Sequence, residues 1–348
     1  MSRAFTVLTV LIIAVAALWA GAWYGASEYA RARLDDAAVA AAAGRPGAEC
    51  ENRRIAGFPL TLSIACGETR VVAPVRGLAA RIAGVVAEVP FYRPGFVRTA
   101  LASPMTLDGP GDIRAEATWQ DARATASAGI WPMGVRQTTG AVANLELRLS
   151  GLPVDAVTIG RGTAAFGSSP AAANSLRADV SFESLKLERT SGAELPEATG
   201  AARIDLIDAG GTVTRDLDDQ LRQWFASGGK VSVDEATLTV SGVAFSASGS
   251  LSVGAGGRLS GDLAVSLVGI DRLPELAETL RPGSGEKARQ VTGVLMAISQ
   301  QVETPDGPSQ KLTSTVSIRD GVVILGFVPL FRLPSVFELA GMNPAAGG

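Results

Sequence analysis

The sequence contains no histidine, only two cysteines and few aromatic residues. Without histidine there is no Ser-His-Asp triad, no Cys-His dyad and no His-ligated zinc site. Lysine is also scarce and the net charge is -3, so the chain lacks the basic face with which proteins displace counterions from nucleic acids. We therefore predict a protein that is not an enzyme, has no cofactor or metal ion and does not bind nucleic acid.

Small apolar residues are abundant instead. Hydrophobic residues make up 47% of the 348-residue chain but aromatic residues only 5%, so Ala, Val, Leu and Ile must build the core. The 40 Gly and 18 Pro residues suit many short strands that are joined by turns. The Gly-rich segment Gly254–Gly257 lies between candidate strands and opens no helix, so it indicates a turn rather than a phosphate-binding loop.

A long uncharged segment lies near the N-terminus. No charged residue occurs from Ala4 to Ala26, and about 20 helical residues are enough to cross the core of a bilayer. Trp19 and Trp23 lie toward one end of this run, as aromatic side chains do at the level of the lipid headgroups. Residues 1–26 are therefore predicted to form a transmembrane anchor. The alternative is a cleavable signal peptide, because Ala20-Gly21-Ala22 resembles a small-residue cleavage site.

The two cysteines flank a candidate strand. Between Cys50 and Cys66, apolar residues alternate with small or polar ones from Phe58 to Ile64, which is the period of a half-buried strand. In an exported chain we predict a Cys50–Cys66 disulfide, with two buried thiols or a metal pair as the alternatives. A disulfide and the lack of a second hydrophobic run both favour export of everything beyond residue 26.

The predicted location is the bacterial inner membrane. The excess of Arg over Lys and the abundance of Ala are typical of proteins from GC-rich bacterial genomes. We therefore expect a single-pass protein whose bulk lies in the periplasm and whose first partner is the lipid bilayer. Beyond the anchor we predict four segments: a helical stalk at 27–48, an N-terminal β-rich part at 49–195, a C-terminal β-rich part with three helices at 196–341 and a flexible tail at 342–348.

The predicted fold class is α+β and β-rich. Short strands joined by tight turns imply a long, curved, mostly antiparallel sheet with a few packed helices. Asp320-Gly321 predicts a hairpin. Helices are predicted at Thr214–Ser227, Asp271–Leu280 and Ser284–Gln300, with Asp271 and Ser284 as N-caps. In the last helix we expect the packed face to consist of Val291, Val294, Leu295 and Ile298.

The segment around the cysteines resembles a known family. An N-terminal anchor followed by Cys50, Arg53-Arg54-Ile55-Ala56-Gly57-Phe58-Pro59-Leu60 and Cys66 is similar to the bacterial domain-of-unknown-function family 2125. That family has a GFPF-like strand between two cysteines just after the anchor, and here Leu60 takes the place of the second Phe. The resemblance covers nearly the whole chain and implies location and architecture, but no activity.

A second similarity suggests a ligand. The Gly-punctuated strands from Val233 to Val268 are similar in texture to AsmA-type envelope proteins, which present an apolar groove on a curved sheet. The resemblance implies lipid or another apolar ligand in a groove lined by Val240, Val243 and Leu251. The alternative is a structural or interaction scaffold with a closed core and envelope proteins as partners. Arg53 and Arg54 are either contacts for lipid phosphates or exposed loop charges.

Overall fold

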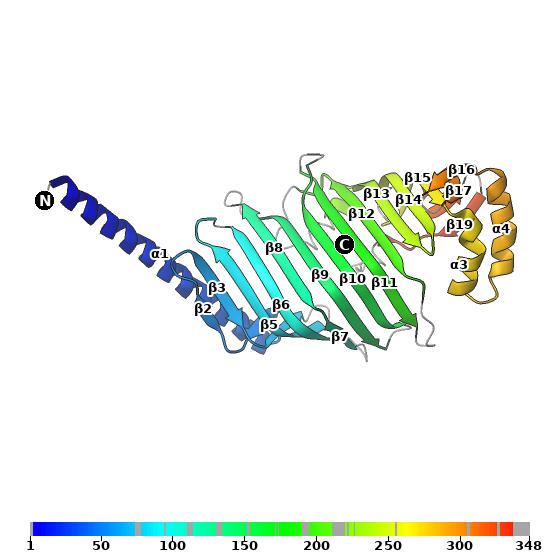
Figure 1. Ribbon diagram of the computed structural model, residues 1–348. Helices are drawn as coiled ribbons and strands as arrows, with labels where there is room; N and C mark the ends of the chain where they lie inside the picture. The colour runs from blue at the N-terminus through cyan, green and yellow to red at the C-terminus, as the bar shows by residue number, and fades with distance from the viewer. Residues whose placement is uncertain are drawn as a thin grey trace. The chain divides into compact units, whose positions relative to one another are not determined.

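The protein is β-rich, with one long N-terminal helix, a large antiparallel sheet and a few further helices (Figure 1). This confirms the predicted fold class. The architecture comes from a computed structural model, which describes residues 3–73, 78–93, 95–109, 114–129, 134–151, 154–170, 172, 174–189, 195–210, 220, 223–225, 227–254, 256–304, 307–325 and 328–336. The predicted tail, residues 342–348, lies outside these ranges.

Contacts divide the chain into two compact units. Unit 1 comprises Met1–Ala128 and Gly140–Val157, and unit 2 comprises Gly129–Thr139 and Thr158–Gly348. The boundary predicted near residue 195 falls within unit 2, and residues 190–194 beside it lie outside the described residues.

One unbroken helix, α1 (Arg3–Ala42), contains both the predicted anchor and most of the predicted stalk. It is the one described helix that is long and apolar enough to cross a membrane. The helix ends before Gly44, whose φ of 68° lies in the left-handed region that commonly ends helices. Strand β1 then packs close against it. A Cβ atom on Gly47 would lie 2.4 Å from the carbonyl oxygen of Ala37, so only glycine fits there.

The strands of unit 1 pair antiparallel. The hydrogen-bonded pairs are β1–β4, β2–β3, β3–β5, β4–β5, β5–β6, β6–β7, β6–β8 and β7–β9. The strand bounds are β1 Gly47–Cys50, β2 Arg54–Ala56, β3 Thr61–Cys66, β4 Thr69–Ala73, β5 Leu78–Pro90, β6 Phe96–Asp108, β7 Arg114–Thr118, β8 Asp121–Gly129 and β9 Gly134–Ser150. The start of β9, up to Thr139, belongs to unit 2.

Unit 2 continues the antiparallel pattern. Pairing runs from β11 through β12, β13, β14, β15, β17 and β18 to β19, and β16 also pairs with β17. The β17–β18 hairpin turns at Asp320-Gly321, both with positive φ, as the sequence predicted. The bounds are β10 Val154–Ser168, β11 Leu176–Arg189, β12 Ala198–Ile207, β13 Lys230–Val240, β14 Val243–Val253, β15 Leu259–Val268, η2 Ile270–Arg272, α3 Leu273–Leu280, α4 Gly285–Ala297, β16 Gln300–Thr304, β17 Gly307–Arg319, β18 Val322–Leu325 and β19 Val328–Arg332.

Two helix predictions need correction. Asp271 is not an N-cap, because it lies within the short 3-10 helix η2 and Arg272 takes the N-cap position of α3. In α4, Val291, Val294 and Ile298 are exposed, so the predicted packed face is wrong. The side that faces α3 instead carries small residues, including the buried Gly285 and Thr292.

The remaining helix predictions are borne out only in part. Ser284 does occupy the N-cap position of α4, although its hydroxyl donates to the carbonyl oxygens of Ala277 and Arg281 instead of capping α4. Of the predicted helix Thr214–Ser227, Gln220 and residues 223–225 are helical, and most of the rest lies outside the described residues.

Candidate functional site

The sheet of unit 2 separates apolar from polar side chains by strand register. Directly opposed residues of antiparallel strands point to the same side, and alternate residues of one strand point to opposite sides. Val231 opposes Leu251, and Phe245 opposes both Leu238 and Leu267, so these positions share one side of the sheet. We call this side the apolar face of unit 2.

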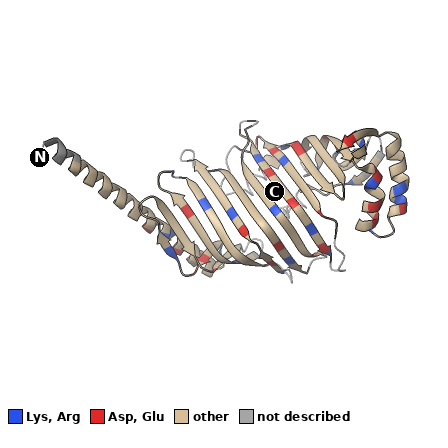
Figure 2. Cartoon of the chain, in the orientation of Figure 1, with Lys and Arg blue, Asp and Glu red and all other residues tan. Residues whose placement is uncertain are grey.

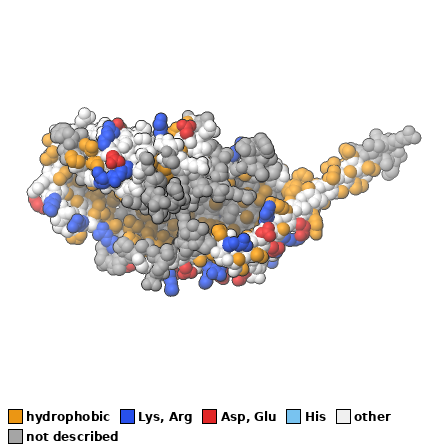
Figure 3. Space-filling model, turned by 180° about the vertical axis from the view of Figure 1, so that it is seen from behind, with side chains coloured by type: hydrophobic (Ala, Val, Ile, Leu, Met, Phe, Trp, Pro, Cys, Tyr) orange, Lys and Arg blue, Asp and Glu red, His pale blue; other side chains and the backbone are white. Residues whose placement is uncertain are grey.

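The apolar face extends over the consecutive strands β11, β12, β13, β14, β15 and β17. The ladder pairs place on it Leu176, Ala178, Val180, Phe182, Ile204, Leu206, Val231, Val233, Ala236, Leu238, Val240, Val243, Phe245, Ala247, Leu251, Val253, Leu259, Leu263, Val265, Leu267, Leu312, Val316 and Ile318. In the space-filling view from behind, hydrophobic side chains gather over the strands, and charged ones lie mainly at the margins (Figure 3).

Packing on the apolar face is uneven. At one end Leu176 and Trp224 are buried, and Phe166, Leu206 and Val231 pack against them. The indole of Trp224 also donates to the carbonyl oxygen of Ile207 at 2.6 Å, so this end is closed by a fixed aromatic side chain. Near the β13–β14 turn the face is more open, because Leu238 and Phe245 each have 41% of their surfaces exposed, and Val180 on β11 has 48% exposed.

The predicted groove residues all lie on the apolar face. Val240 opposes Val243 across the β13–β14 ladder, and Leu251 lies on the same side of β14 as Val243. Val243 is buried, whereas Val240 and Leu251 are half-buried. Leu238, which the strand alternation also assigns to this side, is more exposed than the predicted groove residues. Sequence reasoning missed Phe245, which opposes Leu238 and is equally exposed. The alternation of β14 was the signal that could have identified it.

The opposite side of the sheet is polar. It carries cross-strand pairs such as Arg161 with Glu183 at 3.1 Å and Arg203 with Asp179 at 2.8 Å. Serines occupy the alternate positions of β14 from Ser246 to Ser252. Figure 2 shows that residues of both charge signs are distributed along the strands. Unit 2 therefore has one side suited to water and one side that is only partly covered.

Asp205 is the most buried charge on the polar side. Its carboxylate accepts two hydrogen bonds from the guanidinium of Arg177, which also contacts Asp234 at 2.7 Å. The bonds from Arg177 hold the pKa of Asp205 below its usual range, against the opposing effect of burial. Ion pairing of this kind lowers a pKa and by itself indicates no catalytic role.

Two clefts lie in unit 2 outside the predicted groove. One, of about 660 Å³, lies between α3 and α4 and is lined by Glu278, Arg289 and Thr292 among others. Backbone N–H groups of Gly283 and Gly285 donate to Glu278 and hold its pKa below the usual range. The other, of about 380 Å³, lies beside the β13 bulge and is lined by Arg203, Asp234 and Val265 among others. Neither cleft contains a residue of the predicted groove.

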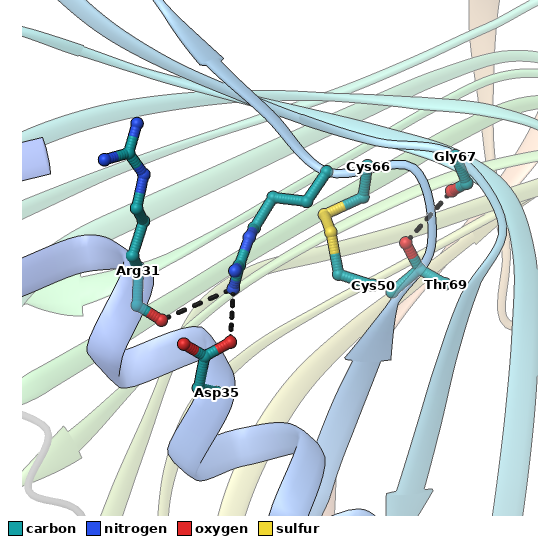
Figure 4. The surroundings of a disulfide bond; sticks show 7 residues. Arg31, Asp35, Cys50, Cys66, Gly67 and Thr69 are labelled. Atoms are coloured by element: carbon teal, nitrogen blue, oxygen red, sulfur yellow. Dashed lines mark hydrogen bonds and ion pairs between the residues drawn. A yellow bond between two sulfur atoms is a disulfide. The ribbon is translucent and has the colours of Figure 1, made fainter. Parts of the chain in front are cut away.

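In unit 1 the cysteine segment is bound to the stalk. Cys50 and Cys66 form a disulfide with Cα atoms 5.3 Å apart, which joins the end of β1 to the end of β3 (Figure 4). Arg53, in the loop that the disulfide closes, pairs with Asp35 at 2.8 Å and donates to the carbonyl oxygen of Arg31 at 3.4 Å. Arg53 thus contacts α1, and Arg54 is exposed to solvent.

Two tryptophans of α1 contact the turn before β3. The indole N–H of Trp19 donates to the carbonyl oxygen of Pro59 at 2.8 Å, and that of Trp23 donates to the carbonyl oxygen of Thr61 at 3.0 Å. Their rings pack edge-on against Phe91 and Phe58, with centroids 5.1 and 5.6 Å apart. The Gly-Phe-Pro-Leu motif is therefore the turn that contacts the apolar part of α1.

Residues 23–334 match the family described as uncharacterized protein conserved in bacteria (DUF2125). The chain belongs to this family. The match confirms the resemblance that the cysteine-flanked motif indicated, and it covers both units. No curated protein and no solved structure shows significant similarity to the chain. Family membership therefore assigns no activity to the chain.

Proposed function

We propose that the protein is a non-enzymatic, single-pass protein of the bacterial inner membrane that binds lipid acyl chains on the apolar face of unit 2. The observation that supports this most is the exposure of large apolar side chains on that face. Leu238 and Phe245 oppose each other near the β13–β14 turn, and Val180 lies two strands away on β11. Exposed apolar surface that is contiguous, rather than scattered, marks a site for an apolar partner.

The energetics suit an acyl chain. Each buried CH₂ group contributes about 0.8 kcal/mol, so ten methylenes would contribute about 8 kcal/mol before the entropic costs of binding. A flexible acyl chain can pack against one side of a sheet without directional contacts. The α1 helix supports the location, since it is long and apolar enough to cross a bilayer. The disulfide supports a periplasmic location, because such bonds persist in oxidising compartments.

Photo-crosslinking in intact cells tests the proposal. A photoreactive phenylalanine analogue at Leu238, on the apolar face, should crosslink to lipid. The same analogue at Ser248, exposed on the polar side of the neighbouring strand, should not. Equal lipid labelling at both positions, or none at Leu238, would refute acyl binding on this face.

The second candidate function is a structural or interaction scaffold, and the exposed apolar stripe of α4 favours it. Val291, Val294 and Ile298 recur at helical spacing and have more than half of their surfaces exposed. Such a stripe suits a protein partner that docks a helix or a hydrophobic groove. Crosslinks to protein from Val294, together with no lipid at Leu238, would favour the scaffold over the lipid-binding protein.

A further inference from the structure

We propose that two turns of unit 1 enter the interfacial layer of the bilayer beside α1 and seat this unit on the membrane. The turns are Gly57–Leu60, between β2 and β3, and Phe91–Arg93, after β5, and together we call them the tip. The proposal rests on membrane anchoring by α1 but is independent of acyl binding by unit 2.

The tip is one structure that is attached to the helix. The backbone N–H of Phe91 donates to the carbonyl oxygen of Leu60 at 2.8 Å, which joins the two turns. Trp19 contacts both turns, through its hydrogen bond to Pro59 and its ring contact with Phe91. Trp23 contacts Phe58 of the first turn and donates to Thr61 at the start of β3. The tip therefore lies at the level of Trp19 and Trp23 along α1.

This level coincides with the edge of the expected bilayer core. The 20 residues from Ala4 to Trp23 span about 30 Å, which matches the thickness of the hydrocarbon layer. The first charged residue of α1 after Arg3 is Glu28, and it lies about 14 Å further along the helix axis than Trp19. A turn bonded to Trp19 consequently lies closer to the membrane than any charged group of the stalk.

The surface of the tip has the chemistry of a membrane interface. Phe58, Leu60 and Tyr92 have 56%, 59% and 69% of their surfaces exposed, although they are large and apolar or aromatic. No acidic residue occurs in either turn, and the one charge is Arg93, whose guanidinium lies 4.5 Å from the ring centroid of Phe96. Aromatic and aliphatic side chains with a single cation match the boundary between acyl chains and anionic headgroups.

Insertion into the membrane interface would explain why these three side chains are exposed. Three large side chains exposed on adjoining turns would cost free energy in water, and the same surface is stabilised in the headgroup layer. The indole N–H groups of Trp19 and Trp23 find their acceptors in the backbone of the tip instead of in water or phosphate. The helix and the tip can therefore enter the interface together without leaving these donors unsatisfied.

Spin-label accessibility in the full-length chain tests the proposal. Single cysteines are introduced at Leu60 and Tyr92 in the tip, at Val15 in α1 and at Ala102 in β6, and each is labelled with a nitroxide while the native disulfide stays intact. The proteins are reconstituted in vesicles of phosphatidylethanolamine and phosphatidylglycerol. At Leu60→Cys and Tyr92→Cys we expect high collision rates with oxygen and low rates with a water-soluble nickel reagent, as at Val15→Cys. Ala102→Cys should show the reverse.

Other outcomes would overturn the proposal in distinguishable ways. Water-like accessibility at the tip together with lipid-like accessibility at Val15→Cys would mean that α1 spans the membrane but the tip stays outside it. Water-like accessibility at Val15→Cys would refute the anchor and the tip together. Low accessibility to both reagents at the tip would mean that protein covers it.

A charge placed in the tip gives an independent test. Leu60→Asp should raise the accessibility of the label at Tyr92→Cys to nickel, because a carboxylate resists entry into the interface. Val86→Asp is the matched control, since Val86 is a partly exposed apolar residue of β5 away from the tip. Unchanged nickel accessibility with Leu60→Asp would contradict the inserted tip.

Discussion

In unit 1 Trp19 and Trp23 of α1 have defined partners, whereas Leu238 and Phe245 on the apolar face of unit 2 remain partly exposed. Trp19 and Trp23 each make one hydrogen bond and one ring contact. Leu238 and Phe245 of unit 2 oppose each other with two fifths of their surfaces exposed. Specific contacts therefore hold the side chains next to the N-terminal helix in place, whereas part of the apolar surface on the sheet of unit 2 remains exposed.

The largest expected effect separates the packed and open parts of the apolar face. Val253→Asp should destabilise unit 2 by more than about 4 kcal/mol, because Val253 has 2% of its surface exposed and an unpaired buried charge is costly. Leu238→Asp on the neighbouring strand should cost about 1 kcal/mol or less, since a charge there reaches water. Denaturant unfolding of both variants measures the difference. Similar losses in both would mean that the face is closed and packed throughout.

Loss of the disulfide should have the next largest effect, and it acts on unit 1. The Cys50→Ser/Cys66→Ser variant should lose about 3 kcal/mol in the chain-entropy account of a loop of this size. Chemical unfolding of the wild type with and without reductant provides the control, and reduction should reproduce the loss. A variant as stable as the oxidised wild type would show that Arg53 and the tryptophan contacts alone hold this segment.

The buried carboxylate on the polar side should show a smaller, pH-dependent effect. Asp205→Asn should lose about 2 kcal/mol at pH 7, since the partly buried Arg177 loses its main partner but keeps Asp234. The folded-state pKa of Asp205 is lowered, so its contribution is fully present above the unfolded value of about 3.9 and is lost as pH falls through the folded value.

The matched control for this charge is Asp179→Asn. Asp179 pairs with Arg203 at 2.8 Å, but both side chains are substantially exposed, so the loss should be below about 1 kcal/mol. Unfolding measured from pH 7 to pH 3 should show a smaller decline in stability for Asp205→Asn than for the wild type. Equal acid sensitivity would exclude Asp205 as a source of the decline.

The smallest expected effect concerns the ion pair between the cysteine loop and the stalk. Arg53→Gln should cost less than about 1 kcal/mol, because the carboxylate of Asp35 is largely exposed. The effect should shrink further at high salt, which screens exposed pairs. Arg54→Gln, at the adjacent exposed position, is the control in the same unfolding measurement. A larger loss for Arg53→Gln that resists salt would identify this contact as a main attachment of the loop.

Local patterns predicted several elements of the fold correctly. The Asp320-Gly321 pair predicted the β17–β18 hairpin because two consecutive residues with positive φ are needed there. The alternation from Phe58 to Cys66 predicted β3, although the strand begins only at Thr61 and Phe58–Leu60 form a turn. The uncharged run from Ala4 to Ala26 predicted the apolar part of α1. In each of these cases a short stretch of sequence carries the physical cause of the structure.

Contacts between segments that are distant in the chain could not be predicted from the sequence. The hydrogen bonds from Trp19 and Trp23 span 40 and 38 residues, and no spacing rule indicates their acceptors. In α4 the hydrophobic period identified a stripe but not its environment. The buried residues of α4 are Gly285 and Thr292, on the side that lines the cleft with α3, whereas Val291 and Ile298 are exposed. Which side of a helix is buried depends on the partner, and its own sequence does not specify the partner.

The continuity of α1 has a mechanical consequence. At 1.5 Å per residue its 40 residues measure about 60 Å, twice the thickness of a bilayer core. The C-terminal end of α1 packs closely against β1 at Gly47. No break separates this end from the proposed anchor. Because α1 is unbroken, a change in the tilt of its proposed membrane-spanning half would also change the orientation of the strands of unit 1 that pack against its other half. A thinner bilayer, which makes such helices lean, would lower these strands toward the lipid surface.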